Sequence, residues 1–229
     1  MYANSRTVAS VQQAPHPRLA ASVRRHLETD WRRPPAAHSV QAFDALRACI
    51  EAAPRPLVLD AGCGTGASTL RLAELHADCW VIGVDKSAAR LAAGARALAT
   101  AGAPRNALLV RAELADFWRL AHAAGWRLRR QYLLYPNPWP KPAQLARRWH
   151  AHPAFAALLA LGGMLELRCN WRVYADEFAR ALDVAGIAAN VEAFVPAGPL
   201  TPFERKYAAS GHALWRVGAR LDTNTVAEG

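Results

Sequence analysis

The chain has little lysine, little methionine and no long uninterrupted apolar run. Only three of its 28 basic residues are lysine, and there are two methionines in 229 residues. The longest apolar run, residues 154–165, is broken by Gly162 and Gly163 and is well short of the roughly 20 residues that a helix needs to span a bilayer. We therefore expect no membrane segment, and the length suits one α/β domain with additions.

Cysteine is also scarce, and its spacing does not indicate a metal or disulfide site. The four cysteines form no C-x-x-C pair and are unevenly spaced: Cys49, Cys63, Cys79 and Cys169. A zinc site or a disulfide framework would need a regular pattern. The sequence therefore predicts no metal centre and a reducing, cytoplasmic setting.

Acidic residues are outnumbered, which favours a polyanionic partner. There are 28 Lys and Arg residues against 18 Asp and Glu residues, a net charge of +10. Arginine dominates, and its planar guanidinium pairs with phosphate and stacks on bases. Nucleic acid is one explanation of this bias, and a GC-rich genome that encodes arginine in place of lysine is the other.

Two segments carry much of the positive charge. Residues 1–37 hold six arginines, several prolines and no sustained helical or strand period. We expect them to form a flexible basic arm ahead of a single domain over residues 38–229, although this composition is also typical of an organelle transit peptide. Residues 105–150 have nine basic residues against two acids, and they bracket the motif at Tyr135–Lys141.

Beyond the arm, hydrophobic periodicity predicts alternating helices and strands. Strands are expected at 57–59, 79–84, 107–110, 131–135 and 164–168, and helices at 39–52, 67–77, 153–161 and 174–185, with one more capped by Ser87. This alternation predicts an α/β fold with a doubly wound, mostly parallel sheet. Two further strands, at 188–194 and 212–217, are expected to close the sheet antiparallel.

A glycine loop, DAGCGTG at residues 60–66, follows the first strand and opens a helix. Gly62, Gly64 and Gly66 let the backbone approach a ligand at the helix N-terminus. The spacing also fits a dinucleotide fingerprint, because Ala67 can replace its last glycine. Asp60 favours another ligand, since a carboxylate repels a pyrophosphate but suits the ammonium and sulfonium of S-adenosylmethionine (SAM). A nicotinamide or flavin cofactor and a purely structural turn are the alternatives.

Two acids further along are candidates for contacts to the same ligand. Asp85 ends the second strand, where ligands bind in open α/β sheets, and it can hold a ribose diol. Its alternative role is to cap the following helix. Glu113, after the third strand, is a candidate for a contact near an adenine, or else a solvated acid.

The second half of the chain carries more specific motifs. YPNPWPK spans Tyr135–Lys141, TPFE spans residues 201–204 and GHALW spans residues 211–215. With the glycine loop, Arg147, Arg148, Trp171 and Tyr174, their order and spacing resemble those of the bacterial tRNA (guanine-N7-)-methyltransferases, the TrmB type, over roughly residues 38–218.

This resemblance implies a Rossmann-like class I fold, SAM as cofactor and methylation of a guanine in the variable loop of tRNA. It implies that Thr201 and Glu204 line the active site. It also makes Asn137, Trp139, Lys141 and Asn170 the candidate catalytic residues. Phosphate contacts to tRNA are expected from Arg147 and Arg148 and from the arm residues Arg24, Arg25, Arg32 and Arg33; a solvated helix face is the alternative.

Two residues depart from the family pattern, because Asn137 and Asn170 stand where the family usually has Asp. Guanine N7 has a lone pair and no proton, so its methylation needs positioning more than a general base. A carboxylate would accept hydrogen bonds from N1–H and the exocyclic amine and stabilise the cationic product. Asn supplies one acceptor and no charge, so we expect a slower or redirected enzyme.

Three other functions fit the same residues. Asn137-Pro138-Trp139 is similar to the Asn-Pro-Pro-aromatic loop of amino methyltransferases, which act on an exocyclic NH2 group. A member that lost two Asp residues could be an RNA-binding module without activity. In a SAM enzyme for a small molecule, the basic clusters would be incidental.

Overall fold

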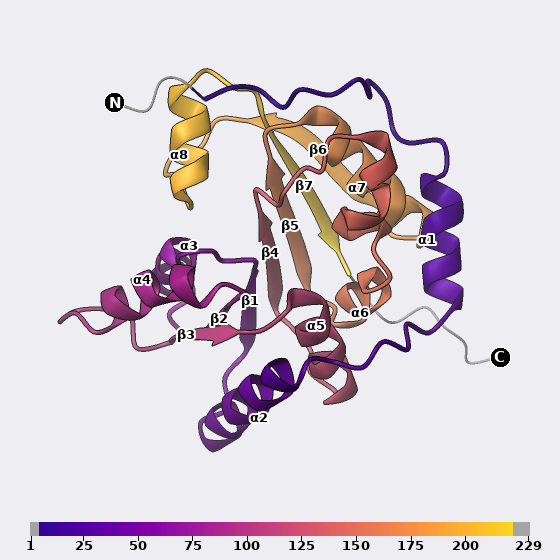
Figure 1. Cartoon of the computed structure of the whole chain (residues 1–229). Helices are drawn as coiled ribbons and strands as arrows, with labels where there is room; N and C mark the ends of the chain where they lie inside the picture. Colours follow the sequence, from indigo (N-terminus) through magenta and orange to yellow (C-terminus); the bar gives the residue numbers. More distant parts are fainter. Residues whose placement is uncertain (1–4, 222–229) are drawn as a thin grey trace.

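The computed structural model describes residues 5–221, and its centre is a seven-stranded sheet in the order β3-β2-β1-β4-β5-β7-β6 (Figure 1). The strands are β1 (Leu57–Ala61), β2 (Trp80–Asp85), β3 (Ala107–Arg111), β4 (Arg130–Leu134), β5 (Met164–Cys169), β6 (Ala189–Phe194) and β7 (Leu214–Arg220). Strands β1 to β5 are parallel, and β7 is antiparallel to both β5 and β6. The predicted doubly wound sheet with antiparallel closure is confirmed.

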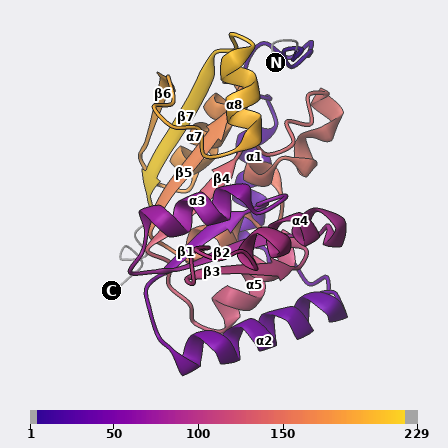
Figure 2. The same ribbon diagram turned by 90° about the vertical axis from the view of Figure 1, so that its left-hand side faces the viewer.

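Helices cover both faces of the sheet. They are α1 (Leu19–Glu28), α2 (Ala37–Ala52), α3 (Ala67–Leu75), α4 (Ala88–Leu98), α5 (Leu114–Ala123), α6 (Phe155–Ala160), α7 (Arg172–Val184) and α8 (Pro202–Ala209), with 3₁₀ turns at Pro142–Arg147 and Trp149–Ala151. Around β1–β3, α3 and α4 lie on one side and α2 and α5 on the other (Figure 2). Helices α1, α6 and α7 lie beside β4, β5 and β7 (Figure 1).

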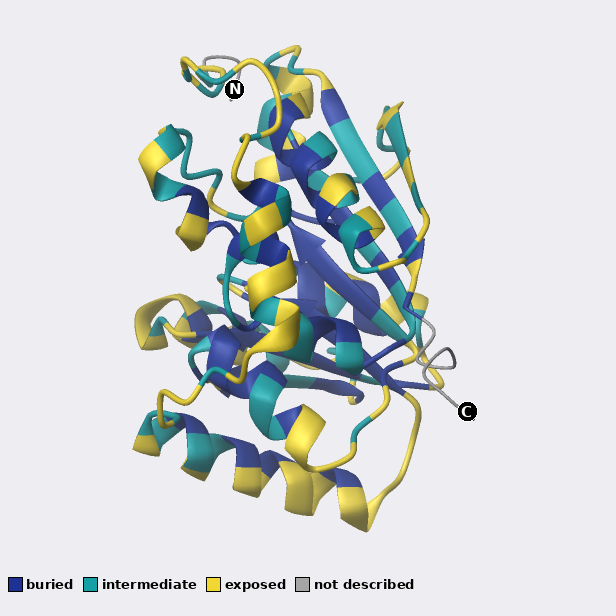
Figure 3. Ribbon diagram, turned by 90° about the vertical axis from the view of Figure 1, so that its right-hand side faces the viewer, coloured by how far each residue is buried: buried dark blue, intermediate teal, exposed yellow. Residues whose placement is uncertain are grey.

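Alternate strand residues pack into two separate clusters. Leu57 and Leu59 of β1 belong to the cluster shared with α2, α5, α6 and α7, whereas Val58 belongs to the cluster that includes Leu72 and Ala73 of α3. Burial on both faces explains why β1 begins with the unbroken apolar run Leu57–Leu59, without alternating polar residues. In Figure 3 the central strands are buried, while α1 and α2 expose their outward sides.

The order of the sheet reverses at β1, which pairs with β2 on one side and β4 on the other. Ligands of open α/β sheets bind outside the carboxyl ends of strands at such a switch point. The glycine loop begins at the end of β1, Asp85 is the last residue of β2, and the proline-rich loop and Asn170 follow β4 and β5. All four therefore lie along this edge.

The N-terminal segment differs from the predicted arm. Residues 5–36 contain α1, whose Leu19 and Val23 are buried, and Trp31 packs against the core. The expectation of no regular structure is therefore wrong here: Leu19 and Val23 are one helical turn apart, a stripe obscured by the surrounding arginines. Residues 1–4 lie outside the described residues, and the division of the chain at residue 37 stays a prediction.

Candidate active site

The glycine loop bends at Gly62, Gly64 and Gly66, whose φ angles are 79°, 60° and 78°. Positive φ of this kind favours glycine. A Cβ at Gly62 or Gly64 would meet no atom within 4 Å, so there is space beside the loop for a ligand. A Cβ at Gly66 would lie 3.0 Å from Leu109 Cδ2, so this third glycine serves packing.

Asp60 is buried beneath the loop and holds the start of α3. Its Oδ2 accepts hydrogen bonds from the hydroxyls of Ser68 and Thr69, both at 2.7 Å. Burial raises the pKa of Asp60 to about 6, against the lowering effect of these two hydrogen bonds, and Asp85 adds to the rise. Asp60 thus has a structural role, and its contact with a cationic ligand stays a prediction.

Asp85 ties the glycine loop to the start of α4. Its Oδ2 accepts from the Gly64 N–H at 3.0 Å and its Oδ1 from the Ser87 N–H at 2.8 Å. Ser87 is the N-cap of α4, as predicted, because its hydroxyl accepts from the Arg90 N–H. Glu113 occupies the N-cap position of α5 without a side-chain cap bond.

The proline-rich loop is backbone-strained at two points. Tyr135 and Trp139, with φ of 52° and 46°, are the non-glycine residues with positive φ in residues 5–221. Such strain persists where the surroundings hold it, often at functional sites. Asn137 and Lys141 are exposed, and the Arg147 guanidinium lies 4.7 Å over the Trp139 ring.

Arg148 does not face solvent, so the prediction that it reaches tRNA phosphate is wrong for this structure. The residue is fully buried. Its Nε and Nη2 donate to the Trp139 carbonyl at 3.2 and 3.0 Å, and its Nη1 donates to Glu177. Its charge is thereby neutralised inside the fold, and it holds the strained loop. Arg147 is exposed and stays a candidate for phosphate.

The tail motif fixes α8 beside the proline-rich loop. Thr201 is the N-cap of α8, and its hydroxyl accepts from the Glu204 N–H at 2.9 Å. The buried Glu204 carboxylate accepts from Arg168 at 2.8 Å and from the Tyr135 hydroxyl at 3.2 Å. Arg168 was not among the residues predicted from sequence, because its partner Glu204 lies 36 residues away in the chain.

Asn170, after β5, contacts the tail and the N-terminal segment. Its Nδ2 lies 3.1 Å from His212 Nδ1, and His212 Nε2 lies 2.8 Å from the Ser5 carbonyl. With a neutral His212, the amide donates to Nδ1 and Nε2–H donates to Ser5. Asn170 is thus engaged in a chain of three groups, which the sequence pattern did not indicate.

The N-terminal segment runs along this edge from α8 toward α1 (Figure 1). The Ser10 hydroxyl donates to the Pro140 carbonyl at 2.6 Å, and Gln12 Nε2 donates to Glu177 at 2.7 Å. The segment therefore joins the proline-rich loop to α7. Glu177 was missed from sequence, although an acid among the apolar positions of a helix is a signal of a buried partner.

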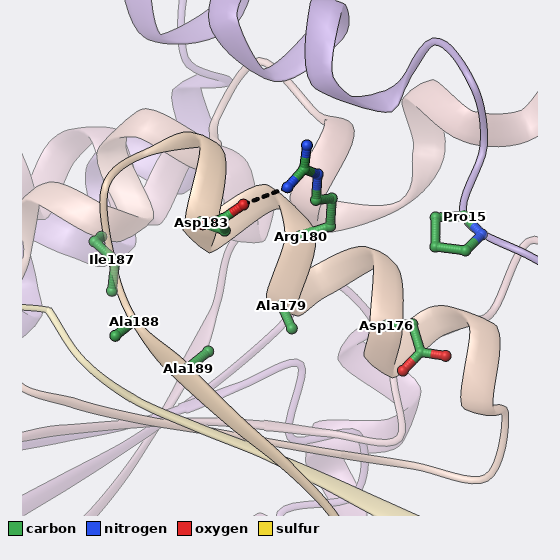
Figure 4. Close-up of a pocket in the computed structure, with 8 residues that line it drawn as sticks. All are labelled: Pro15, Asp176, Ala179, Arg180, Asp183, Ile187, Ala188 and Ala189. Carbon is green, nitrogen blue, oxygen red and sulfur yellow. Dashed lines mark hydrogen bonds and ion pairs between the residues drawn. The ribbon is translucent and has the colours of Figure 1, made fainter.

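A separate hollow lies between α7 and β6 (Figure 4). Its volume is about 590 Å³, and it is lined by Pro15, Asp176, Ala179, Arg180, Asp183, Ile187, Ala188 and Ala189. None of the predicted site residues lines it. Across residues 5–221, no group of three or more His, Cys, Asp or Glu side chains could hold a metal ion, and no helix is both long and apolar enough to cross a membrane.

Comparison with known proteins assigns the fold. A family model described as "Putative methyltransferase" matches residues 54–217. The 16S rRNA methyltransferase KamB aligns with a TM-score of 0.58 at 20% identity, over 77% of this chain and 93% of that one. A mutant 16S rRNA (adenine(1408)-N(1))-methyltransferase from Catenulisporales acidiphilia, solved with cosubstrate SAM, gives 0.57 at 19% identity over 81% and 94%. The fold is that of a Rossmann-like class I SAM-dependent methyltransferase.

More similar sequences define the family within that class. A tRNA (guanine-N(7)-)-methyltransferase of Leifsonia xyli subsp. xyli is 31% identical over 170 residues, which cover 70% of this chain and 74% of the relative. Another, of Alkalilimnicola ehrlichii, is 32% identical over 215 residues, 86% of each chain. The chain belongs to the tRNA (guanine-N7-)-methyltransferase family, as a divergent member.

Proposed function

We propose that this chain transfers a methyl group from SAM to N7 of a guanine in tRNA. One observation supports this most directly: the open glycine loop with Asp60 and Asp85 lies on the same sheet edge as the strained loop with Asn137 and Trp139. A methyl transfer needs a donor site and a base site held side by side. The net charge of +10 suits a polyanionic substrate, and such a substrate fits a cytoplasmic location.

The residues of the glycine loop suit SAM. The space beside Gly62 and Gly64 would admit the methionine part, and the N-terminus of α3 suits its carboxylate. Asp60 would face the ammonium group, Asp85 the ribose hydroxyls and Glu113 the adenine. When bound, SAM supplies a methyl group on a positively charged sulfur.

The base site needs no proton acceptor, because guanine N7 carries a free lone pair. Its work is to orient the base and to tolerate the positive charge of the product. The Trp139 ring offers a stacking surface, and the exposed Asn137 amide offers one acceptor to the base edge. Lys141 and Arg147 are exposed beside them and suit phosphate.

The remaining site residues come from the tail, the end of β5 and the N-terminal segment. Thr201 and Glu204 hold α8 against β5 and bring the Glu204 carboxylate to Tyr135. Asn170 adds an amide at the end of β5. The arginines of the N-terminal segment that we assign to phosphate are all exposed: Arg24, Arg25, Arg32 and Arg33.

The test combines the purified full chain, methyl-labelled SAM and unfractionated tRNA, followed by nucleoside analysis. We expect 7-methylguanosine. N6-methyladenosine would point to exocyclic-amine chemistry, and tRNA binding without labelling would point to an RNA-binding module. A chain that labels only small molecules, with turnover insensitive to salt, would contradict a nucleic-acid substrate.

A further inference from the structure

An exposed aromatic ring stands on α8, next to the candidate active site. Phe203 is 55% exposed, although it lies in the first turn of a helix whose neighbouring Glu204 is completely buried. Single exposed hydrophobic residues are common and need no explanation by themselves. Phe203 differs because it ends a stack of rings.

Three rings lie in series along α8 and the residues after it. Phe203 and Tyr207 stack with centroids 6.2 Å apart and planes 26° apart. Tyr207 and His212 stack at 5.1 Å and 17°. Tyr207 and His212 are half-buried, so Phe203 is the exposed end of the stack. Another flat ring placed on Phe203 would continue the series.

The inner rings of this stack contact residues of the candidate active site. The Tyr207 centroid lies 5.5 Å from that of Tyr135, the strained first residue of the proline-rich loop. His212 Nδ1 lies 3.1 Å from the Asn170 amide. The stack therefore leads from Tyr135 and Asn170, at the edge of the candidate active site, outward to Phe203.

The charged residues of α8 that are not buried are both positive. Arg205 is exposed and Lys206 half-buried on the same helix, and the one acid of α8, Glu204, is buried in an ion pair with Arg168. An exposed aromatic ring among cations is the arrangement that binds single-stranded nucleic acid, because the ring stacks a base while the cations neutralise the backbone.

We propose that Phe203 is a stacking platform for an unpaired base of the substrate RNA, adjacent to the base that is methylated. The proposal rests on the proposed function, since it requires an RNA substrate, and it adds a contact outside the reacting base. Stacking of this kind contributes to binding of any base. Phe203 is therefore expected to act on RNA affinity and KM, with kcat little changed.

The test compares three variants, Phe203→Ala, Phe203→Leu and Phe203→Trp, in tRNA binding and in methyl transfer. Phe203→Ala and Phe203→Leu are expected to weaken tRNA binding roughly five-fold or more and to raise KM in proportion. Phe203→Trp keeps a stacking ring and is expected to retain affinity. The matched control is Leu75→Ala on α3, because Leu75 is 57% exposed and lies outside this stack.

Unchanged affinity in Phe203→Ala would overturn the proposal, as would full affinity in Phe203→Leu, because leucine is apolar but cannot stack. A fall in kcat at unchanged affinity would also overturn it. Thermal melting verifies that each variant is folded. An active wild type with unaffected Phe203 variants refutes the platform alone, whereas a wild type that neither binds nor methylates tRNA refutes the proposed function as well.

Discussion

Arg148 and Glu177 form a completely buried ion pair beneath the proline-rich loop, with Nη1 2.5 Å from Oε2. The same guanidinium donates twice to the Trp139 carbonyl. The other carboxylate oxygen of Glu177 accepts from Gln12 Nε2 at 2.7 Å and from the His16 N–H at 2.9 Å. One ion pair therefore joins the N-terminal segment, α7 and a strained residue of the candidate active site.

Glu177→Gln is expected to destabilise the whole fold. Burial disfavours the charged carboxylate, but hydrogen bonds from His150 and Arg148 hold the pKa of Glu177 at about 2, so the group is ionised at neutral pH. When residue 177 is neutral, the buried Arg148 cation has no opposite charge beside it. This is expected to lower the free energy of unfolding by about 3–5 kcal/mol. Urea denaturation measures this loss.

The control for that variant lies on the same helix. Asp183 pairs with Arg180 at the surface, where the two side chains are 65% and 56% exposed. Asp183→Asn is expected to change the free energy of unfolding by less than about 1 kcal/mol. Equal losses in the two variants would contradict a special role for the buried pair.

His152 is expected to make the protein less stable in mild acid. Burial, with smaller effects of His26 and Arg33, lowers the pKa of His152 from 6.5 to about 4. The unfolded chain therefore binds a proton at this position near pH 6.5 and the folded chain only near pH 4. The contribution of neutral His152 to the free energy of unfolding is therefore full above pH 6.5, the pKa of the unfolded chain. It is lost progressively as the pH drops from there toward 4, the pKa of the folded chain.

His152→Gln removes this titration and can still accept the Ala154 N–H, which His152 Nδ1 accepts at 3.1 Å. Denaturation of both proteins at a series of pH values gives the slopes. We expect a shallower pH dependence in His152→Gln. Parallel curves would assign the acid sensitivity to other groups.

Asp60 is expected to make the affinity for SAM depend on pH. Its pKa of about 6, raised by burial, means that the carboxylate becomes neutral in mild acid. If it faces the SAM ammonium as proposed, SAM affinity falls as the pH drops below this value. Calorimetric titration measures the affinity, and Asp60→Asn is expected to bind SAM weakly at every pH. A variant with the wild-type pH profile would contradict the assignment.

Asn137→Asp is expected to speed up methyl transfer to guanine. The carboxylate would accept two hydrogen bonds from the base edge and would stabilise the positive product, a gain of roughly five-fold or more in kcat/KM. Initial rates with labelled SAM and tRNA test this. The double variant with Asn170→Asp shows whether the second amide also limits the rate. A slower Asn137→Asp enzyme would contradict the prediction and would mean that this active site is adapted to an amide at residue 137.

Local patterns predicted most of the sheet and the order of the site elements. Strand periodicity and the Ser87 cap depend on neighbouring residues, so they are visible in the chain itself. Helix α8 was not predicted, because its one buried residue is an acid, Glu204, and a hydrophobic pattern cannot show an acid that is neutralised by Arg168. The prediction for Arg148 failed for the same reason: sequence alone does not show whether an arginine has a buried partner.

The sequence by itself determined the fold class, the glycine loop between two acids, and the family motifs, because each depends on residue types at short, regular spacing. The tertiary structure decided which charged side chains are neutralised by partners inside the protein and which stay exposed and can bind a substrate. Arg148 and Glu177 lie 29 residues apart, and only folding brings them together. Because a buried charge without a partner is costly, these two side chains must pair. Arg147, the residue before Arg148, stays exposed to solvent.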